Sequence, residues 1–233
     1  MGVLIRCNDV NFTNYVGIAD YPIISALKEL YYFGGTADLS KKDHSGNGND
    51  GSFVGSETIN SKSVIFSGGG TSNYLSIPTG TSGITSVHAV SLVKKTGKRG
   101  ILAAVGGAND GGFVFGTERT IYKDGSGWID MSATLADADG FYPLAWSITP
   151  SGCAMYRLNS EGNLVTINSK SGGSLNSNIL PRTVGGTNYN WAMDGSAEIA
   201  VVGAYEGTVT ESQLKDALTF LRAYGEANEL TVI

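Results

Sequence analysis

Cysteine, histidine and proline are scarce in this 233-residue sequence, with 2, 2 and 5 residues respectively. Two cysteines do not build a disulfide scaffold, so we predict that Cys7 and Cys153 are free, buried thiols, with a single bridge as the alternative. The histidines, His44 and His88, lack the paired spacing of a zinc site. We expect His88 to be packed or interfacial in a strand and His44 to be solvated.

Charged residues are also few. They form 16% of the sequence, whereas about a quarter is usual. The formal net charge is −5, and the densest basic group, at residues 94–99, reads as a strand end followed by a turn. A surface that binds phosphates needs a broader positive face, so we expect no nucleic-acid partner.

Long apolar runs are absent. No stretch of about 18 apolar residues occurs, so the sequence predicts no membrane-spanning helix and no membrane partner. The first six residues also lack the basic start and apolar run of a signal peptide. We therefore expect the chain to act where it is made or to leave the cell without a leader.

Glycine is plentiful, with 33 residues. Short apolar or alternating runs lie between turn residues about every 8–12 positions, which is typical of a β-sandwich or jelly roll. Residues 23–30, in contrast, show weak helical spacing. The predicted strands cover residues 31–33, 53–54, 63–66, 74–77, 86–93, 101–105, 113–115, 120–122, 127–131, 144–148, 154–158, 163–167, 183–184 and 198–204.

The sequence predicts one convincing helix, over about residues 210–224. Thr210 is a good N-cap, and Gln213 follows at the spacing of a capping box. Gly225 is expected to end the helix at the C′ position. An apolar stripe predicts that the helix packs against a sheet, and it consists of Leu214, Ala217, Leu218, Leu221 and Tyr224.

These patterns predict an all-β chain, an antiparallel two-sheet jelly-roll sandwich with one C-terminal helix. We divide it into residues 1–24 and a single domain over residues 25–233. Residues 1–24 form either an arm for attachment or oligomer contact, or an edge strand of the same domain.

Several motifs occur in an order that resembles the concanavalin A-like lectin/glucanase superfamily, in its laminin G-like jelly-roll branch. The resemblance covers about residues 30–225 and implies two antiparallel sheets with ligand loops along one rim. The chain departs from the pattern at residues 91–94, where family members often carry tryptophan, and before the strand that begins at residues 141–143, where they often carry Trp-His-His. The motifs lie at residues 31–35, 38–40, 43–51, 64–68, 74–78, 91–95, 144–147, 155–159, 161–162, 184–186, 194–200 and 210–224.

The glucanases of this superfamily carry three acidic residues on one face of a strand, as Glu-x-Asp-x-x-Glu. None of the nine glutamates here stands in such a set. Asp137 and Asp139 are two residues apart, but Gly140 follows them and the segment reads as a turn. We therefore predict a non-enzymatic protein. A glycosidase or lyase remains the alternative if carboxylates meet from distant strands.

The polar loop at residues 43–51 offers hard oxygen donors, which Ca²⁺ prefers. We expect no required cofactor, and we name this loop as a candidate calcium site. The alternative is that these side chains cap their own turns. The candidate ligands are Asp43, Asn47, Asn49 and Asp50.

Sugar binding needs an aromatic face for the apolar side of a pyranose, and amides or carboxylates for its hydroxyls. A glycine-flanked loop fits this description, although Trp191 could instead fold over the core. The candidate glycan ligands are Asn188, Tyr189, Asn190 and Trp191, followed by Trp128, Asn109 and Asp110.

Together, the resemblance, the missing leader and the N-terminal arm favour a lectin-like protein on the surface of a phage virion. Such a protein would be an adhesion or capsid decoration protein or a tail fibre. Its expected partners are cell-surface glycan, other virion proteins and copies of itself, for example in a trimer. The alternatives are a purely structural virion protein and a polysaccharide-cleaving enzyme.

Overall fold

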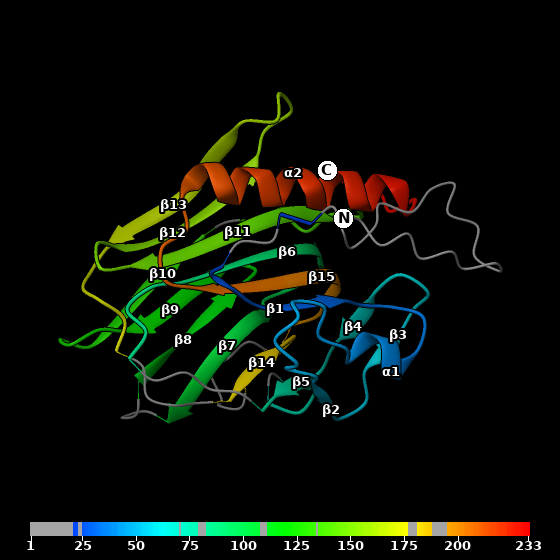
Figure 1. The fold of residues 1–233 in the computed structure, drawn as a ribbon, viewed down its shortest axis with the longest axis horizontal. Coiled ribbons are helices and arrows are strands. Elements are labelled where there is room, and N and C mark those ends of the chain that lie inside the picture. Colours follow the sequence, from blue (N-terminus) through cyan, green and yellow to red (C-terminus); the bar gives the residue numbers. More distant parts are fainter. Residues whose placement is uncertain are drawn as a thin grey trace, which may run out of the picture.

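The computed structural model describes residues 21–22, 25–69, 71–78, 83–107, 111–133, 135–176, 181–187 and 195–233. In these residues, two antiparallel sheets pack face to face and one long helix lies on the outside (Figure 1). The predicted all-β sandwich with a C-terminal helix is therefore confirmed. No helix in the described ranges is long and apolar enough to cross a membrane.

Sheet A has eight strands. Its order is β13-β12-β11-β6-β15-β4-β3, and β1 also pairs with β15. The strands are β1 (Leu27–Tyr32), β3 (Thr58–Ile59), β4 (Val64–Phe66), β6 (Val87–Lys95), β11 (Tyr142–Thr149), β12 (Gly152–Leu158), β13 (Leu164–Ser171) and β15 (Ala197–Glu206).

Sheet B has seven strands, in the order β10-β9-β8-β7-β14-β5-β2. A short helix, α1 (Ala37–Ser40), follows β1, and the long helix α2 (Glu211–Ala227) follows β15. The strands of sheet B are β2 (Ser52–Val54), β5 (Tyr74–Ile77), β7 (Gly100–Gly107), β8 (Gly111–Gly116), β9 (Arg119–Lys123), β10 (Trp128–Ser132) and β14 (Arg182–Val184).

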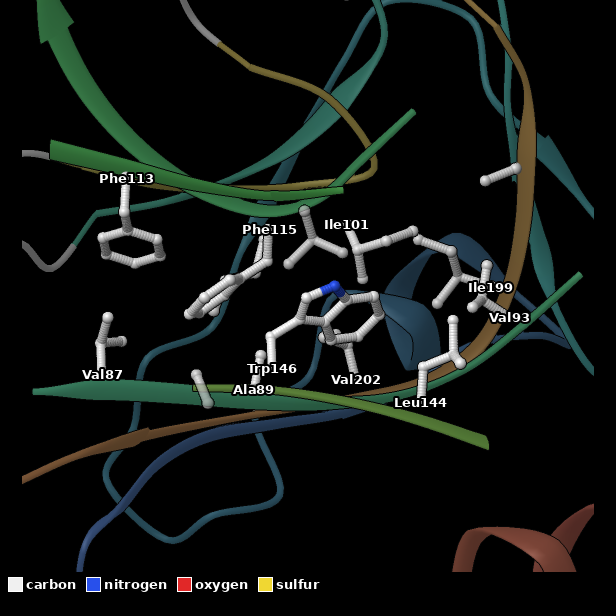
Figure 2. Close-up of a cluster of buried hydrophobic side chains, with 14 of the residues drawn as sticks. Val87, Ala89, Val93, Ile101, Phe113, Phe115, Leu144, Trp146, Ile199 and Val202 are labelled. Carbon is white, nitrogen blue, oxygen red and sulfur yellow. The ribbon is translucent and has the colours of Figure 1, made fainter. Parts of the chain in front are cut away.

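The main core lies between the two sheets. Trp146 of β11 projects from sheet A toward Phe115 of β8 (Figure 2). Their ring centroids are 6.2 Å apart, and the indole Nε1 donates to the carbonyl of Gly116 at 3.2 Å. Burying an aromatic ring of this size contributes roughly 1.5–3 kcal/mol, and the hydrogen bond satisfies its polar end.

Helix α2 lies along the outer face of sheet A (Figure 1), and a second apolar cluster joins the two. Because β6, β11 and β15 are covered on both faces, their sequences are almost continuously apolar rather than alternating. The predicted helix start is confirmed. Thr210 and Gln213 form the reciprocal capping box, and the predicted apolar stripe is buried.

The predicted end of this helix at Gly225 is wrong. The helix continues to Ala227, and Asn228 is the C-cap. Gly225 lies inside the helix, and a Cβ at this position would stand 2.5 Å from Val232 Cγ2 and 3.1 Å from Leu92 Cδ2. The glycine therefore allows the last residues of the chain to pack closely on the helix.

The helical spacing over residues 23–30 was also misleading, since Leu27 begins strand β1. The strand pairs with β15 and has a bulge between Leu27 and Glu29. A bulge inserts one residue and shifts the alternation of side chains. Leu27 and Leu30 therefore share one face of a strand, although their spacing of three suggests a helix.

Tyr21 is the one aromatic residue of the predicted N-terminal arm that lies in the described part. Its hydroxyl is hydrogen-bonded to that of Tyr205, and its ring meets Phe220 edge-on at 5.1 Å. Burial raises the pKa of the Tyr21 hydroxyl well above its usual value. Residues 1–20, 23 and 24 lie outside the described residues, so the division of the chain at residue 24 stays a prediction.

Candidate functional site

The two outer faces of the sandwich differ. Helix α2 covers sheet A, whereas the outer face of sheet B carries a small apolar cluster from β7, β8 and β9. Trp128, at the start of β10, is partly buried and packs against this cluster. The apolar cluster consists of Ala103, Val105, Val114 and Ile121.

Strands β9 and β10 place alternate residues on the same outer face as this cluster, because side chains of a strand alternate between faces. On β9 these are Arg119, Ile121 and Lys123, since Tyr122 points into the main core. On β10 they are Trp128, Asp130 and Ser132. We call Arg119, Ile121, Lys123, Trp128 and Asp130 the Trp128 face.

Trp128 and Lys123 are direct cross-strand partners. The ammonium group of Lys123 lies over the indole, 5.9 Å from the ring centroid. A cation in this position is attracted by the negative face of the ring. The Trp128 face therefore presents an aromatic ring and a positive charge side by side.

Asp130 and Arg119 form a bidentate ion pair on the same face. Arg119 Nε donates to Asp130 Oδ1 at 2.8 Å, and Arg119 Nη2 donates to Asp130 Oδ2 at 2.5 Å. The hydrogen bonds from Arg119 lower the pKa of Asp130 below its usual value. The two side chains are 38% and 39% exposed, so both remain accessible to a hydroxyl-bearing ligand.

The turn before Trp128 is held by Asp124. Its Oδ1 atom accepts hydrogen bonds from Ser126 N, Ser126 Oγ and Gly127 N at 2.7–2.9 Å, and these bonds lower the pKa of Asp124 to about 2. A Cβ built on Gly125 or Gly127 would meet no atom within 4 Å. The turn is thus fixed by its own hydrogen bonds and has open space beside Trp128.

Most of the predicted glycan ligands lie outside the described residues. They are Asn109 and Asp110, and the group from Asn188 to Trp191. Their predicted roles therefore stay predictions.

The residues that flank these two segments show where each is attached. Gly107 pairs with Gly111, at the end of sheet B where Lys123 and Trp128 lie. Thr187 and Gly195 flank the other segment, and Gly195 donates to the carbonyl of Lys98 at the opposite end of β7. The flanks of the two predicted groups are therefore attached to opposite rims of the sandwich.

The predicted calcium ligands engage one another and β1. Asp43 Oδ1 accepts from Leu30 N and Ser45 N, and its Oδ2 accepts from Ser45 Oγ and Asn49 N, all at 2.8–3.1 Å. Asn47 and Asn49 both donate through Nδ2 to the carbonyl of Lys28, at 3.0 and 3.1 Å.

Asp50 completes the loop. Its Oδ1 accepts from Asp43 N at 2.9 Å and its Oδ2 accepts from Lys42 Nζ at 2.7 Å. These contacts are those of side chains that cap their own turns, and a cation would have to displace several of them. Across the described part of the chain, no group of three or more His, Cys, Asp or Glu side chains is placed to hold a metal ion. Calcium binding stays a prediction.

Three other sequence predictions concern single residues. Cys153 is free and buried as predicted, whereas Cys7 lies outside the described residues. His88 is packed as predicted. Its Nε2 contacts the carbonyl of Gly207 at 3.0 Å, and burial lowers its pKa to about 4. His44 is half-buried rather than fully solvated, because its ring packs edge-on against Tyr32 at 5.4 Å.

The segment around Asp137 and Asp139 contains no strand, as the turn prediction requires. Asp137 Oδ1 lies 2.5 Å from Lys95 Nζ, which also contacts Glu118 Oε1 at 2.7 Å. Asp139 is fully exposed and lies 3.9 Å from Lys94. The prediction that the protein is not an enzyme stays a prediction.

Comparison with known proteins places the chain by its fold alone. No protein-family model matches the sequence, and no curated protein matches it by sequence. Solved structures with the same fold are numerous. One is domain 4 of AbnA, an extracellular GH43 arabinanase from Geobacillus stearothermophilus, solved in complex with arabinotriose. It is 16% identical with a TM-score of 0.60, over 82% of this chain and 98% of that one.

Two further neighbours are larger proteins. A structure of botulinum neurotoxin type C, whose cell entry depends on interaction with two ganglioside molecules, has a TM-score of 0.61 at 10% identity, over 88% of this chain and 53% of that one. Trypanosoma rangeli sialidase has a TM-score of 0.53 at 13% identity, over 85% and 33%. These neighbours share a β-sandwich fold with the chain.

Proposed function

We propose that the protein is a carbohydrate-binding module, and that its ligand packs on the Trp128 face. The observation that carries this proposal is the arrangement around the indole. A partly exposed ring lies beside the Asp130–Arg119 pair on one surface, next to a glycine turn with open space. Aromatic rings bind the apolar face of a sugar, and paired charged groups bind its hydroxyls.

Neighbouring structures support the proposal in a general way. One neighbour was solved with arabinotriose, and another interacts with gangliosides. A shared fold does not transfer a ligand, so the Trp128 face carries the argument. We propose binding without bond cleavage, as the sequence predicts. Attachment to a virion, capsid or tail location and a trimeric state stay predictions, and the neighbouring genes and light scattering would test them.

The test is a glycan array followed by isothermal titration calorimetry on the best ligand. We expect Trp128→Ala to weaken binding at least about thirtyfold, since truncating a central aromatic anchor costs ~2 kcal/mol or more. Trp128→Phe should retain part of the affinity, because it keeps an aromatic face.

Tyr74→Ala is the matched control. Tyr74 is a half-buried aromatic on the same outer face of sheet B. It lies on β5, five strands from β10 and therefore roughly 24 Å away. Binding should be unchanged in this variant. If no glycan binds the folded protein, or if Tyr74→Ala and Trp128→Ala behave alike, the proposal fails.

A further inference from the structure

Three cations and two carboxylates of the described residues lie around Trp128. Among the described residues, the cations are Arg119, Lys123 and Lys170, and the carboxylates are Asp124 and Asp130. The chain as a whole carries a net charge of −5, so a surface where cations outnumber carboxylates departs from its average.

The two carboxylates are already engaged by protein groups. Asp130 is paired with Arg119, and Lys170 Nζ donates to the backbone carbonyl of Asp130 at 2.7 Å. Asp124 accepts hydrogen bonds from Ser126, Gly127 and Gly173. A ligand approaching the indole therefore meets carboxylates that already accept hydrogen bonds from neighbouring donors.

The ammonium group of Lys123 lies over the face of the ring, 5.9 Å from its centroid. A sugar that packs on the indole brings its substituents to this ammonium. A hydroxyl would form an ordinary hydrogen bond there, whereas a carboxylate would form a charge-assisted one, which is roughly twice as strong.

We infer that the sugar bound on the Trp128 face is acidic, with a carboxylate that pairs with Lys123. Uronic acids and sialic acids are the sugars with this chemistry. The inference rests on the proposed function, because it names the ligand class of the same site. It assigns stacking to Trp128 and charge selection to Lys123.

The experiment uses the full chain and two pairs of probes. Polygalacturonate and polysialic acid are each compared with their carboxyl-reduced forms, which keep the sugar rings and lose the charge. We expect at least one acidic polymer to bind, and its reduced form to bind at least about tenfold more weakly. Raising the salt concentration should weaken binding of the acidic polymer and leave binding of the reduced form unaffected.

Variants separate the two roles. Lys123→Gln should weaken binding of the acidic polymer about tenfold and leave binding of the reduced polymer unchanged. Trp128→Ala should weaken the binding of both polymers. Lys215→Gln, on the exposed side of α2, removes the same charge elsewhere and should change neither. Circular dichroism and thermal unfolding of each variant confirm that it is folded.

The outcomes distinguish this inference from the proposal beneath it. If the reduced polymers bind as well as the acidic ones, or if Lys123→Gln has no effect while Trp128→Ala abolishes binding, the ligand is a neutral sugar and the inference is overturned. If Trp128→Ala has no effect on any glycan that binds, the proposed function itself is wrong.

Discussion

Arg99 is fully buried between loops at one rim of the sandwich, and its replacement gives a sharp stability prediction. The guanidinium donates to four backbone carbonyls at 2.5–3.2 Å, those of Gly185, Gly68, Asn73 and Gly195. These carbonyls belong to the β4–β5 connection and to the two flanks of residues 188–194. One side chain therefore ties together the loops of this rim.

Arg99→Met keeps much of the apolar volume and removes all the donors. Each hydrogen bond to a charged group contributes ~1.5–3 kcal/mol, but relaxation and water entry recover part of the sum. A buried carbonyl left without a donor costs ~1–3 kcal/mol, and with partial recovery we expect a total loss of ~3–5 kcal/mol from the four. Arg99→Lys should lose less stability than Arg99→Met, because an ammonium keeps the charge and some donors. It should still lose some, because it lacks the planar fork of the guanidinium.

Urea unfolding, followed by circular dichroism, measures this loss as a shift of the midpoint at constant slope. The melting temperature should fall by roughly 6–20 °C, at about 2–4 °C per kcal/mol for a chain of this size. Arg222→Met is the control, since Arg222 donates from α2 to a single carbonyl, that of Asn159, at 3.1 Å. A loss below about 1 kcal/mol for Arg99→Met would refute the reasoning.

Three further predictions concern stability. Burial lowers the pKa of His88 to about 4, so as the pH falls the unfolded chain is protonated at His88 before the folded chain is. The free energy of unfolding should therefore fall by ~3 kcal/mol between about pH 6.5 and 4. His88→Gln should flatten that part of the pH curve, and an unchanged slope would contradict the assignment. Arg182 pairs with Glu29 and Glu206 in the interior, so Arg182→Met should cost ~3–5 kcal/mol by chemical denaturation, and a neutral result would show the network to be dispensable. Thr210→Ala should cost ~1 kcal/mol through loss of the capping box, and no change would mean that packing alone sets the start of α2.

Local patterns in the sequence predicted most of the fold. Strand β5 and the capping box of α2 were predicted correctly because each depends on neighbouring residues. The errors came from long-range effects. The bulge in β1 lies in its pairing with β15, and Gly225 packs against Leu92 of β6, so both depend on segments far away in the chain.

Buried charges could not be predicted from the sequence either. Arg99 was taken for part of a turn, yet its carbonyl partners lie 26 to 96 residues away. The same limit applies to the candidate site. Trp128 was predicted as a glycan ligand from its glycine-rich turn. That it lies on one face with Lys123 and Arg119 follows only from the register in which β9 pairs with β10. The alternation of Arg119, Ile121 and Lys123 was the signal that could have suggested it.

The central claim is that a sugar ring lies on the indole of Trp128, and a crystal structure of the protein with its best array ligand tests it most directly. The account predicts electron density for a sugar ring with its apolar face about 4 Å from that indole and its carboxylate on Lys123. Density for the ligand on another surface, with the Trp128 face bare, would contradict it.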